Sequence, residues 1–401
     1  MRNSLKILLA TVLAWCALVE VTVAFVVRQF GFRPDGDWFL ILAASSPAEI
    51  SEFFRTYSRE LTLVAAGLVV LIAEIVGLVF FVKGRGRWIF ATAVLGYLAW
   101  SIPQGAGWPP AFFAFDTIRG IARYRELVAA GRWDGELLPG VAERPAGTAT
   151  NLVVVLGESM TTDRMSLYGY ARPTTPFLDG SRDRMSVMGP VRAVATSTVT
   201  ALRLMLTQAT VEKPDRAVET AAVALRRRGY RPVLISAQPK WTRRCGVGQM
   251  LFAACETKIY LADNERGSGL WDHALVGFLK REIAVADERP FAIFLHLQGS
   301  HFDPKYRVPP GFVAPSGFDD YDRSVCYTDA VLEAIRKALP PRTVMVYVSD
   351  HGETPDSPSW RDARDDSLWK VPLVIYPKDE ALPSVDSADH LLDLLLAVVG
   401  G

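Results

Sequence analysis

Long apolar runs fill the first quarter of the chain, and shorter ones recur at intervals after it. Apolar runs cover residues 5–27, 61–82 and 88–102, and Pro103 closes the third. About 20 apolar residues suffice to cross a bilayer as a helix. No small-residue cleavage site follows the first run, which favours an uncleaved span over a signal peptide. The pattern therefore predicts three membrane-spanning helices.

Positive charges beside these runs predict their orientation. Arg2 and Lys6 flank the first run, while Lys83, Arg85 and Arg87 fill the short loop between the second and the third. Basic residues concentrate in cytoplasmic loops. Three spans that start in the cytoplasm end on the opposite side. We therefore expect a multi-pass protein of the inner membrane whose residues after Pro103 lie in the periplasm, or outside the cell if there is no outer membrane.

The next segment mixes apolar and basic positions. Residues 111–133 combine phenylalanines and aliphatic side chains with arginines, and residues 131–150 are rich in Gly, Pro and Ala. The first pattern favours an amphipathic helix on the membrane surface, with an ordinary linker helix as the alternative, and the second indicates a boundary loop. We expect a membrane domain over 1–103, this helix and linker over 104–150, and a soluble domain over 151–401.

From residue 151 onwards, short β-branched and apolar runs alternate with helical patterns. Expected strands are 152–156, 232–236, 291–297, 343–349 and 371–376, and expected helices include 217–228, 270–286 and 321–338. Strands that alternate with helices are typical of a mostly parallel sheet covered on both faces. The sequence therefore predicts an α/β fold for the soluble domain.

Net charge and cysteine content bear on nucleic-acid binding and on disulfide formation. The formal net charge is +1, so no basic field points to nucleic acid. Cys245 and Cys255 bracket a short segment. In the oxidising compartment that the topology predicts, these two cysteines are candidates for a disulfide.

Acidic residues follow two of the predicted strands directly. Glu158 stands after the run at 152–156, and Asp350 and His351 stand after the run at 343–349. Ligands gather beyond the carboxyl ends of strands in open α/β sheets. Two carboxylates and an imidazole suit Zn²⁺, with Mn²⁺ as the alternative, and leave a position open for a nucleophile.

These residues belong to longer motifs. The motif GES at 157–159, the run LYGYARPTTPFL at 167–178 and SDHGE at 349–353 resemble the alkaline phosphatase and sulfatase superfamily. Within it, the chain is most similar to the membrane-anchored phosphoethanolamine transferases of Gram-negative envelopes. The resemblance starts near residue 151 and implies an alkaline-phosphatase-like α/β/α sandwich.

The resemblance also implies a nucleophile at the start of a helix. Within residues 195–207, the residue in the nucleophile's place is Thr198, ahead of the neighbouring hydroxyls of Thr196, Ser197 and Thr200. A helix that begins there directs its free amides and the positive end of its dipole at a phosphate. The alternative is a simple N-cap with interchangeable hydroxyls.

A third motif segment follows the strand at 291–297. Its Gly-Ser-His turn ends at His301, which the resemblance identifies as a residue that contacts the substrate phosphate or a second metal ion.

Two features depart from the family pattern. Arg203 and Leu204 stand where members that modify lipid A have cysteines and a proline. Residues 354–370 lack the histidine that the transferases carry there, although this segment contains Asp356, Asp362, Asp365 and Asp366. Either an aspartate takes that place or the second metal position is absent, so we expect one firmly held metal ion.

The function that the resemblance implies is a two-step group transfer. Thr198 takes phosphoethanolamine from phosphatidylethanolamine, and an acceptor on lipopolysaccharide, of the lipid A type, or on another envelope glycan then receives it. A phosphoglycerol transferase or a sulfatase-like hydrolase is the first alternative. A degenerate, non-catalytic membrane sensor or scaffold is the second.

Overall fold

The computed structural model describes residues 3–30, 47–81, 150–213, 219–238, 246–261, 271–285, 288–357 and 360–400. The chain divides into two compact units, Met1–Tyr124 and Arg125–Gly401. The predicted third span and the whole 104–150 segment lie outside the described residues, so both stay predictions.

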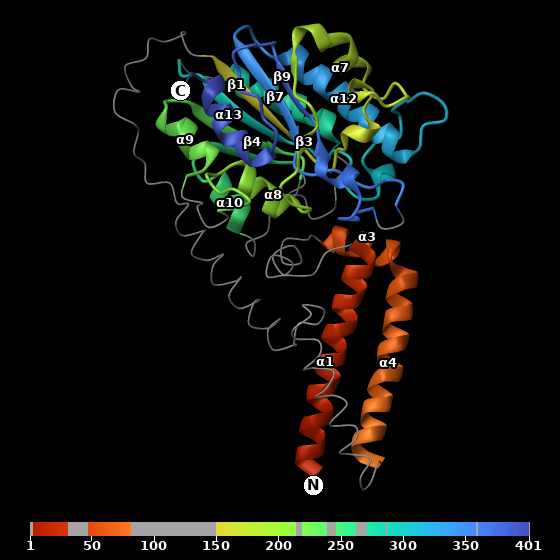
Figure 1. Cartoon of the computed structure of the whole chain (residues 1–401). Coiled ribbons are helices and arrows are strands. Elements are labelled where there is room, and N and C mark those ends of the chain that lie inside the picture. The colour runs from red at the N-terminus through yellow and green to blue at the C-terminus, as the bar shows by residue number, and fades with distance from the viewer. Residues whose placement is uncertain are drawn as a thin grey trace. The chain divides into compact units, whose positions relative to one another are not determined.

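The first unit contains a pair of long apolar helices. Helices α1 (Asn3–Phe30) and α4 (Ser58–Phe81) pack side by side, and the short α3 (Pro47–Thr56) precedes α4 (Figure 1). The pair is antiparallel, because Lys6 Nζ near the start of α1 donates to Phe80 O at the end of α4 at 3.3 Å. Both helices are long and apolar enough to cross a membrane, in agreement with the first two predicted spans.

The second unit is built on a seven-stranded sheet in the order β2-β9-β7-β1-β6-β4-β5. β7, β1, β6, β4 and β5 are parallel, β9 is antiparallel to β7, and β2 is antiparallel to β9. A second sheet pairs β3 with β8. The strands are β1 Asn151–Gly157, β2 Ser186–Val187, β3 Val191–Arg192, β4 Arg231–Ser236, β5 Thr257–Tyr260, β6 Phe291–His296, β7 Thr343–Ser349, β8 Lys370–Val371 and β9 Leu373–Tyr376.

Four of the five predicted strands are confirmed, and the fifth is divided. The apolar run at 371–376 forms β8 and β9 in different sheets, with Pro372 between them. Proline lacks the N–H that a continuous ladder needs, so the strand cannot run through it. β2, β3 and β5 were not predicted, because two to four residues are too short to show a period.

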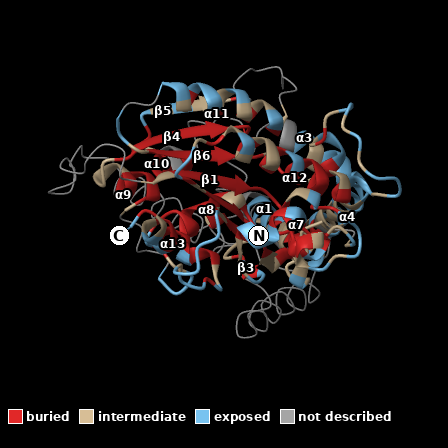
Figure 2. Cartoon of the chain, turned by 90° about the horizontal axis from the view of Figure 1, so that it is seen from above, coloured by how far each residue is buried: buried red, intermediate tan, exposed pale blue. Residues whose placement is uncertain are grey.

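Helices cover both faces of the sheet. α7, α11 and α12 share one apolar core with the side chains of Val153, Val155, Ile293 and Tyr347. The opposite face is covered in part by α9, which contacts β4, and by the segment after α10, where the Phe252 ring meets Phe294 of β6 at 5.5 Å. Figure 1 shows α8, α9, α10 and α13 on this side, and Figure 2 shows that β1, β4 and β6 are buried along their length.

The helices of this unit begin and end as follows: α7 Pro176–Ser181, α8 Thr198–Met205, α9 Ala221–Arg227, α10 Gly246–Leu251, α11 Leu275–Ala284, α12 Asp320–Ala338 and α13 Leu391–Val398. Single 3₁₀ turns are η2 Thr162–Arg164, η3 Ser166–Tyr168, η4 Arg182–Arg184, η5 Asp272–Ala274, η6 Pro304–Tyr306, η7 Asp366–Trp369 and η8 Ala388–His390.

Candidate functional site

The central parallel strands place two acidic residues next to each other. In the pairing of β1 with β7, Gly157 lies opposite Ser349, so Glu158 and Asp350 leave the sheet at the same level. Potential ligand atoms of Glu158, Asp350 and His351 all lie within 4.8 Å of one another. All three residues are completely buried. The structure thus brings together the three residues that the strand-end pattern predicted.

These three residues fit a divalent cation. Among the described residues, Asp350 Oδ2 and His351 Nε2 have no hydrogen-bond partner, although both atoms are buried. The second ring nitrogen, His351 Nδ1, lies 2.8 Å from Gly352 O, and this contact requires a proton on Nδ1 and leaves the Nε2 lone pair free. His351 Nε2 lies 3.4 Å from Asp350 Oδ2 and 3.6 Å from Glu158 Oε1. A cation among these atoms would supply the partner that they lack.

The protonation equilibria of these groups support a cation. Burial, and then the charge of Asp350, raise the pKa of Glu158, and burial also raises the pKa of Asp350. Burial, together with the charge of Arg361, lowers the pKa of His351 to about 4, so its ring is neutral at pH 7. Two carboxylates that repel each other and a neutral imidazole gain from a shared divalent ion.

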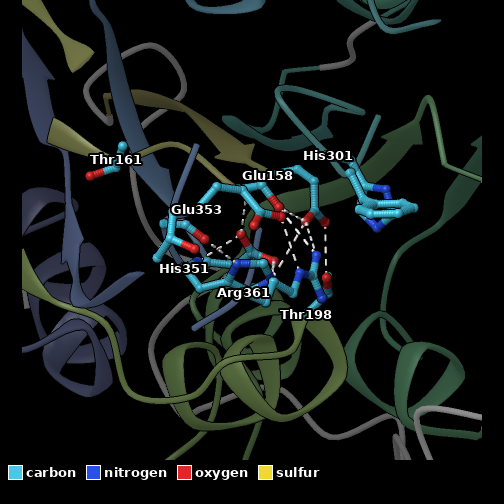
Figure 3. A network of polar contacts seen from close by, with 12 residues as sticks. Glu158, Thr161, Thr198, His301, His351, Glu353 and Arg361 are labelled. Carbon is cyan, nitrogen blue, oxygen red and sulfur yellow. Dashed lines mark hydrogen bonds and ion pairs between the residues drawn. The ribbon is translucent and has the colours of Figure 1, made fainter. Parts of the chain in front are cut away.

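Thr198 is the first residue of α8 and enters this cluster. Its Oγ1 donates to Glu158 Oε2 at 2.9 Å, and the residue is half-buried (Figure 3). The N-cap of α8 is Ser197, whose side chain makes no capping bond and instead donates to Thr200 Oγ1 at 3.3 Å. Thr198 is therefore not the N-cap. Its bond to a candidate metal ligand is the structural feature that favours Thr198 over the neighbouring hydroxyls.

Two residues without an assigned role in the sequence hold Glu158 in place. Gln238, in the turn after β4, donates from Nε2 to Glu158 Oε2 at 2.9 Å and to Leu297 O at 3.1 Å. Ser159 donates from Oγ to Glu158 Oε1 at 2.7 Å and from its backbone N to Asp350 Oδ1 at 3.1 Å. The backbone of Ser159 is left-handed, with φ of 57°. Such strain in a residue other than glycine is typical of functional sites.

A tight turn after β6 supports the backbone of Glu158. Ser300 N donates to Glu158 O at 2.9 Å, and Gly299 in the same turn has φ of 54°. Asp272, at the start of η5, accepts from Gln298 N at 2.8 Å and Gly299 N at 2.9 Å. This buried carboxylate therefore fixes the turn that leads into His301.

His301 lies at the side of this cluster (Figure 3) and is not one of the three grouped metal ligands. Arg307 Nη2 is 3.5 Å from His301 Nδ1. Burial and the nearby charges of Arg307 and Arg361 hold the pKa of His301 well below its ordinary value, so the ring is neutral. A neutral imidazole at this place suits contact with a ligand oxygen, and its predicted role in substrate binding stays a prediction.

Three of the four aspartates downstream of SDHGE have other partners than the site residues. Asp356 pairs with Arg164, Asp362 with Arg364, and Asp365 caps η7. Asp366 belongs to η7 itself. Among the described residues of this segment, Arg361 enters the cluster, and its Nε lies 3.0 Å from Glu353 Oε1. Burial raises the pKa of Glu353 to about 7. Among the described residues, Glu353 Oε2 has no hydrogen-bond partner.

The sequence contains a signal for one of the two site residues that it did not predict, and none for the other. Gln238 follows a predicted strand by two residues, so the strand-end rule that found Glu158 would also have found Gln238. Arg361 lies in a loop without any pattern, and nothing in the sequence distinguishes it from Arg364. Cys255 is a free, buried cysteine and Cys245 lies outside the described residues, so the predicted disulfide is not confirmed.

Comparison with known proteins places this arrangement in a family. The model of the sulfatase family matches residues 150–398, which is more than half of the chain. The chain belongs to the sulfatase family. The predicted membership of the alkaline phosphatase and sulfatase superfamily is therefore confirmed, and the matched residues include Glu158, Thr198, Asp350 and His351.

Its curated relatives are named as transferases. Phosphoethanolamine transferase EptC of Escherichia coli K12 is 30% identical over 227 residues, which cover 50% of this chain and 39% of that protein. Phosphoethanolamine transferase CptA of Salmonella typhimurium is 27% identical over 282 residues, covering 62% and 49%. The Kdo(2)-lipid A phosphoethanolamine 7''-transferase of E. coli K12 is 24% identical over 270 residues, covering 61% and 47%. The chain thus spans half or less of the length of these relatives.

Solved structures confirm the alkaline-phosphatase-like fold. The zinc complex of the C-terminal periplasmic domain of E. coli EptC has a TM-score of 0.55 at 25% identity, covering 63% of this chain and 82% of that one. The integral membrane lipooligosaccharide phosphoethanolamine transferase EptA of Neisseria meningitidis has a TM-score of 0.61 at 16% identity, covering 100% and 84%. A member of the alkaline phosphatase superfamily from Vibrio parahaemolyticus has a TM-score of 0.51 at 21% identity, covering 70% and 75%.

Proposed function

We propose that this protein transfers phosphoethanolamine from phosphatidylethanolamine to an acceptor on lipopolysaccharide or another envelope glycan. The observation that carries the proposal is the hydrogen bond from Thr198 Oγ1 to Glu158 Oε2, beside the buried carboxylate of Asp350 and the imidazole of His351. It joins a candidate nucleophile to a candidate metal site at the start of a helix. The names of the relatives supply the group that is transferred.

Thr198 performs the chemical step in this proposal. Its hydroxyl loses its proton along the bond to Glu158 Oε2, and Oγ1 forms a bond to the donor's phosphorus. The bond from phosphorus to the glycerol oxygen breaks, and diacylglycerol leaves after it takes up one proton. The phosphoethanolamine group is then held as an ester on Thr198. In the second half, an acceptor hydroxyl or protonated phosphate attacks the same phosphorus, the bond from phosphorus to Thr198 Oγ1 breaks, and Thr198 takes up the proton that the acceptor loses.

The metal ion that fits this site is Zn²⁺, which Glu158, Asp350, His351 and the oxygen of Thr198 would hold. The zinc complex of the E. coli relative supports this choice, with Mn²⁺ as the alternative. When bound, such an ion lowers the pKa of a coordinated hydroxyl and neutralises charge on phosphate oxygens. Gln238 and Ser159 orient Glu158 for this role through the hydrogen bonds that they donate to its two oxygens.

The two long apolar helices of the first unit support a donor that lies in the membrane. α1 and α4 are long and apolar enough to span the bilayer, and a phospholipid head group is reached only at the bilayer surface. We propose a multi-pass anchor in the inner membrane with the catalytic domain in the periplasm.

The alternatives predict different results at the same site. A phosphoglycerol transferase would take its group from phosphatidylglycerol, and a sulfatase-like hydrolase would release its group to water. A scaffold would need neither nucleophile nor metal. Thr198 bonded to Glu158 favours an enzyme over a scaffold, because a scaffold gains nothing from a buried cluster of unpaired ligand atoms.

The test is the donor half-reaction. The full-length protein, purified with zinc, is incubated with phosphatidylethanolamine in mixed micelles, without acceptor, and its intact mass is measured beside Thr198→Ala and Thr196→Ala. We expect a phosphoethanolamine adduct on the parent and on Thr196→Ala, an equal amount of released diacylglycerol, and no adduct on Thr198→Ala. An adduct only with phosphatidylglycerol would support the first alternative, and bound zinc without any adduct would contradict transfer from either lipid.

A further inference from the structure

The segment after SDHGE brings a guanidinium to the place for which the sequence left two alternatives, an aspartate or no second metal ligand. The contacts of Arg361 join it to three residues of the site: Nε lies 3.0 Å from Glu353 Oε1, and Nη2 lies 3.3 Å from Ser159 Oγ and 3.7 Å from Glu158 Oε1. The side chain is 22% exposed, so it can be reached from solvent. Figure 3 shows Arg361 in the same network as Glu158 and Thr198.

Arg361 takes up carboxylate oxygens that a second divalent ion would need. Glu158, Asp350 and Glu353 are three buried carboxyl groups, and Arg361 is the cation that contacts two of them. Its guanidinium lies 3.0 Å from Glu353 Oε1 and 3.7 Å from Glu158 Oε1. A buried cation that already pairs with these oxygens favours a site with one metal ion.

Arg361 also lies in a suitable place for a phosphate. Thr198 bonds to Oε2 of Glu158 and Arg361 faces Oε1, so the nucleophile and the guanidinium flank the same carboxylate. Within the described part of the chain, the polar contacts of the guanidinium use Nε and Nη2 and leave Nη1 for a ligand. Hydrogen bonds from a guanidinium N–H to a phosphate oxygen are charge-assisted and strong, so Nη1 suits a phosphate ligand.

We propose that Arg361 is the second cation of this site: it binds the non-bridging oxygens of the transferred phosphate, and the site holds a single metal ion. The proposal deepens the proposed function and rests on it. Arg361 is then a catalytic residue that contacts the substrate. It stabilises negative charge on the phosphate while the bond to Thr198 forms, and the ion pair with Glu353 holds it in position.

The alternative is that Arg361 only neutralises the charge of Glu353. A double variant that lacks both side chains distinguishes this role from phosphate binding. If Arg361 serves Glu353 alone, Glu353→Gln combined with Arg361→Gln restores the binding of phosphate that Arg361→Gln loses. If Arg361 binds phosphate itself, the double variant remains defective.

The experiment uses the full-length protein in detergent. Zinc per chain is measured by plasma mass spectrometry, and binding of inorganic phosphate to the zinc-loaded protein is measured by calorimetry. Arg364→Gln is the matched control, because Arg364 lies three residues away and pairs with Asp362 at the exposed surface. Arg361→Lys keeps the charge and loses the planar donors.

We expect one zinc ion per chain in all variants. Phosphate should bind about 10 to 100 times more weakly to Arg361→Gln and to the double variant, as expected for a lost hydrogen bond to a charged group. Arg361→Lys should fall between, and Arg364→Gln should match the parent. Two zinc ions in the parent, parental affinity in Arg361→Gln, or recovery in the double variant would each overturn the proposal. Arg361-dependent phosphate binding without a lipid-derived adduct would instead refute only the donor assignment.

Discussion

Gly299 offers a sharp test of how the turn after β6 supports the site. A methyl group added at Gly299 would lie 2.5 Å from Glu158 O, 3.0 Å from Glu158 N and 3.1 Å from Glu158 Cβ. The closest of these contacts is shorter than real Cβ contacts allow, and it is made with backbone that cannot rotate away. Gly299→Ala must therefore displace Glu158, the turn, or both.

The free-energy cost has two parts that a second glycine separates. Gly299 has φ of 54° and Gly317 has φ of 83°, but a methyl group at Gly317 would meet nothing within 4 Å. Both alanine variants lose about 1–2 kcal/mol for an alanine in the left-handed region. Gly299→Ala loses about 1–3 kcal/mol more for overpacking. In a domain of this size, that difference lowers the melting temperature by roughly a further 2 to 12 °C.

The assay compares thermal melting and zinc affinity of both variants with the parent. We expect both variants to melt below the parent and Gly299→Ala to melt clearly lower. We expect only Gly299→Ala to bind zinc more weakly, because its clash involves Glu158, the proposed zinc ligand. Equal melting temperatures, together with parental zinc affinity in Gly299→Ala, would refute the claim that this turn positions Glu158.

Three further predictions concern the same site. Gln238→Ala should weaken zinc binding about 10- to 100-fold, as for other partners of metal ligands, because Glu158 Oε2 loses a donor at 2.9 Å; equilibrium dialysis with a competing chelator measures this, and unchanged affinity would contradict it. Burial raises the pKa of Asp272 from 3.8 to about 6, so the folded state holds the carboxyl proton more tightly than the unfolded state does. The stabilisation from this bound proton is complete below about pH 4 and is lost as the pH rises towards 6. Over that interval, the free energy of unfolding of the parent should fall by about 3 kcal/mol relative to Asp272→Asn. Melting curves from pH 4 to 7 check that sign, and a constant difference would refute it. Removing zinc with a chelator should lower the melting temperature, since ligand at 100 times its Kd stabilises by about 2.7 kcal/mol, whereas the metal-free and zinc-loaded proteins should melt alike if the cluster binds no ion.

Much of the fold could be predicted, because buried parallel strands are continuous apolar runs. The runs at 152–156 and 343–349 became β1 and β7 with nearly the expected bounds. Their adjacency placed Glu158 beside Asp350, as the strand-end rule requires. The divided run at 371–376 shows the limit of that reading, because Pro372 interrupts a pattern that looks continuous by hydropathy alone.

Residues brought in by loops could not be predicted, because their neighbours depend on long-range packing. Asp356 was a candidate for the site and instead pairs with Arg164 at 2.6 Å. Arg361 was not considered and lies within the site. Ser159 was part of a recognised motif, but only its left-handed backbone shows how it reaches both Glu158 and Asp350. Family likeness selected Thr198, and the structure supplies a contact that the likeness could not give.

The most direct test of the central claim is to locate the transferred group on the protein. After incubation with phosphatidylethanolamine that carries an isotopic label in its head group, the chain is digested and the peptide that contains residues 196–200 is fragmented. This peptide holds four candidate hydroxyls: Thr196, Ser197, Thr198 and Thr200. The account predicts labelled phosphoethanolamine on Thr198 alone, in a zinc-dependent amount. Label on another of these residues, or an unlabelled peptide from zinc-loaded protein, would contradict it.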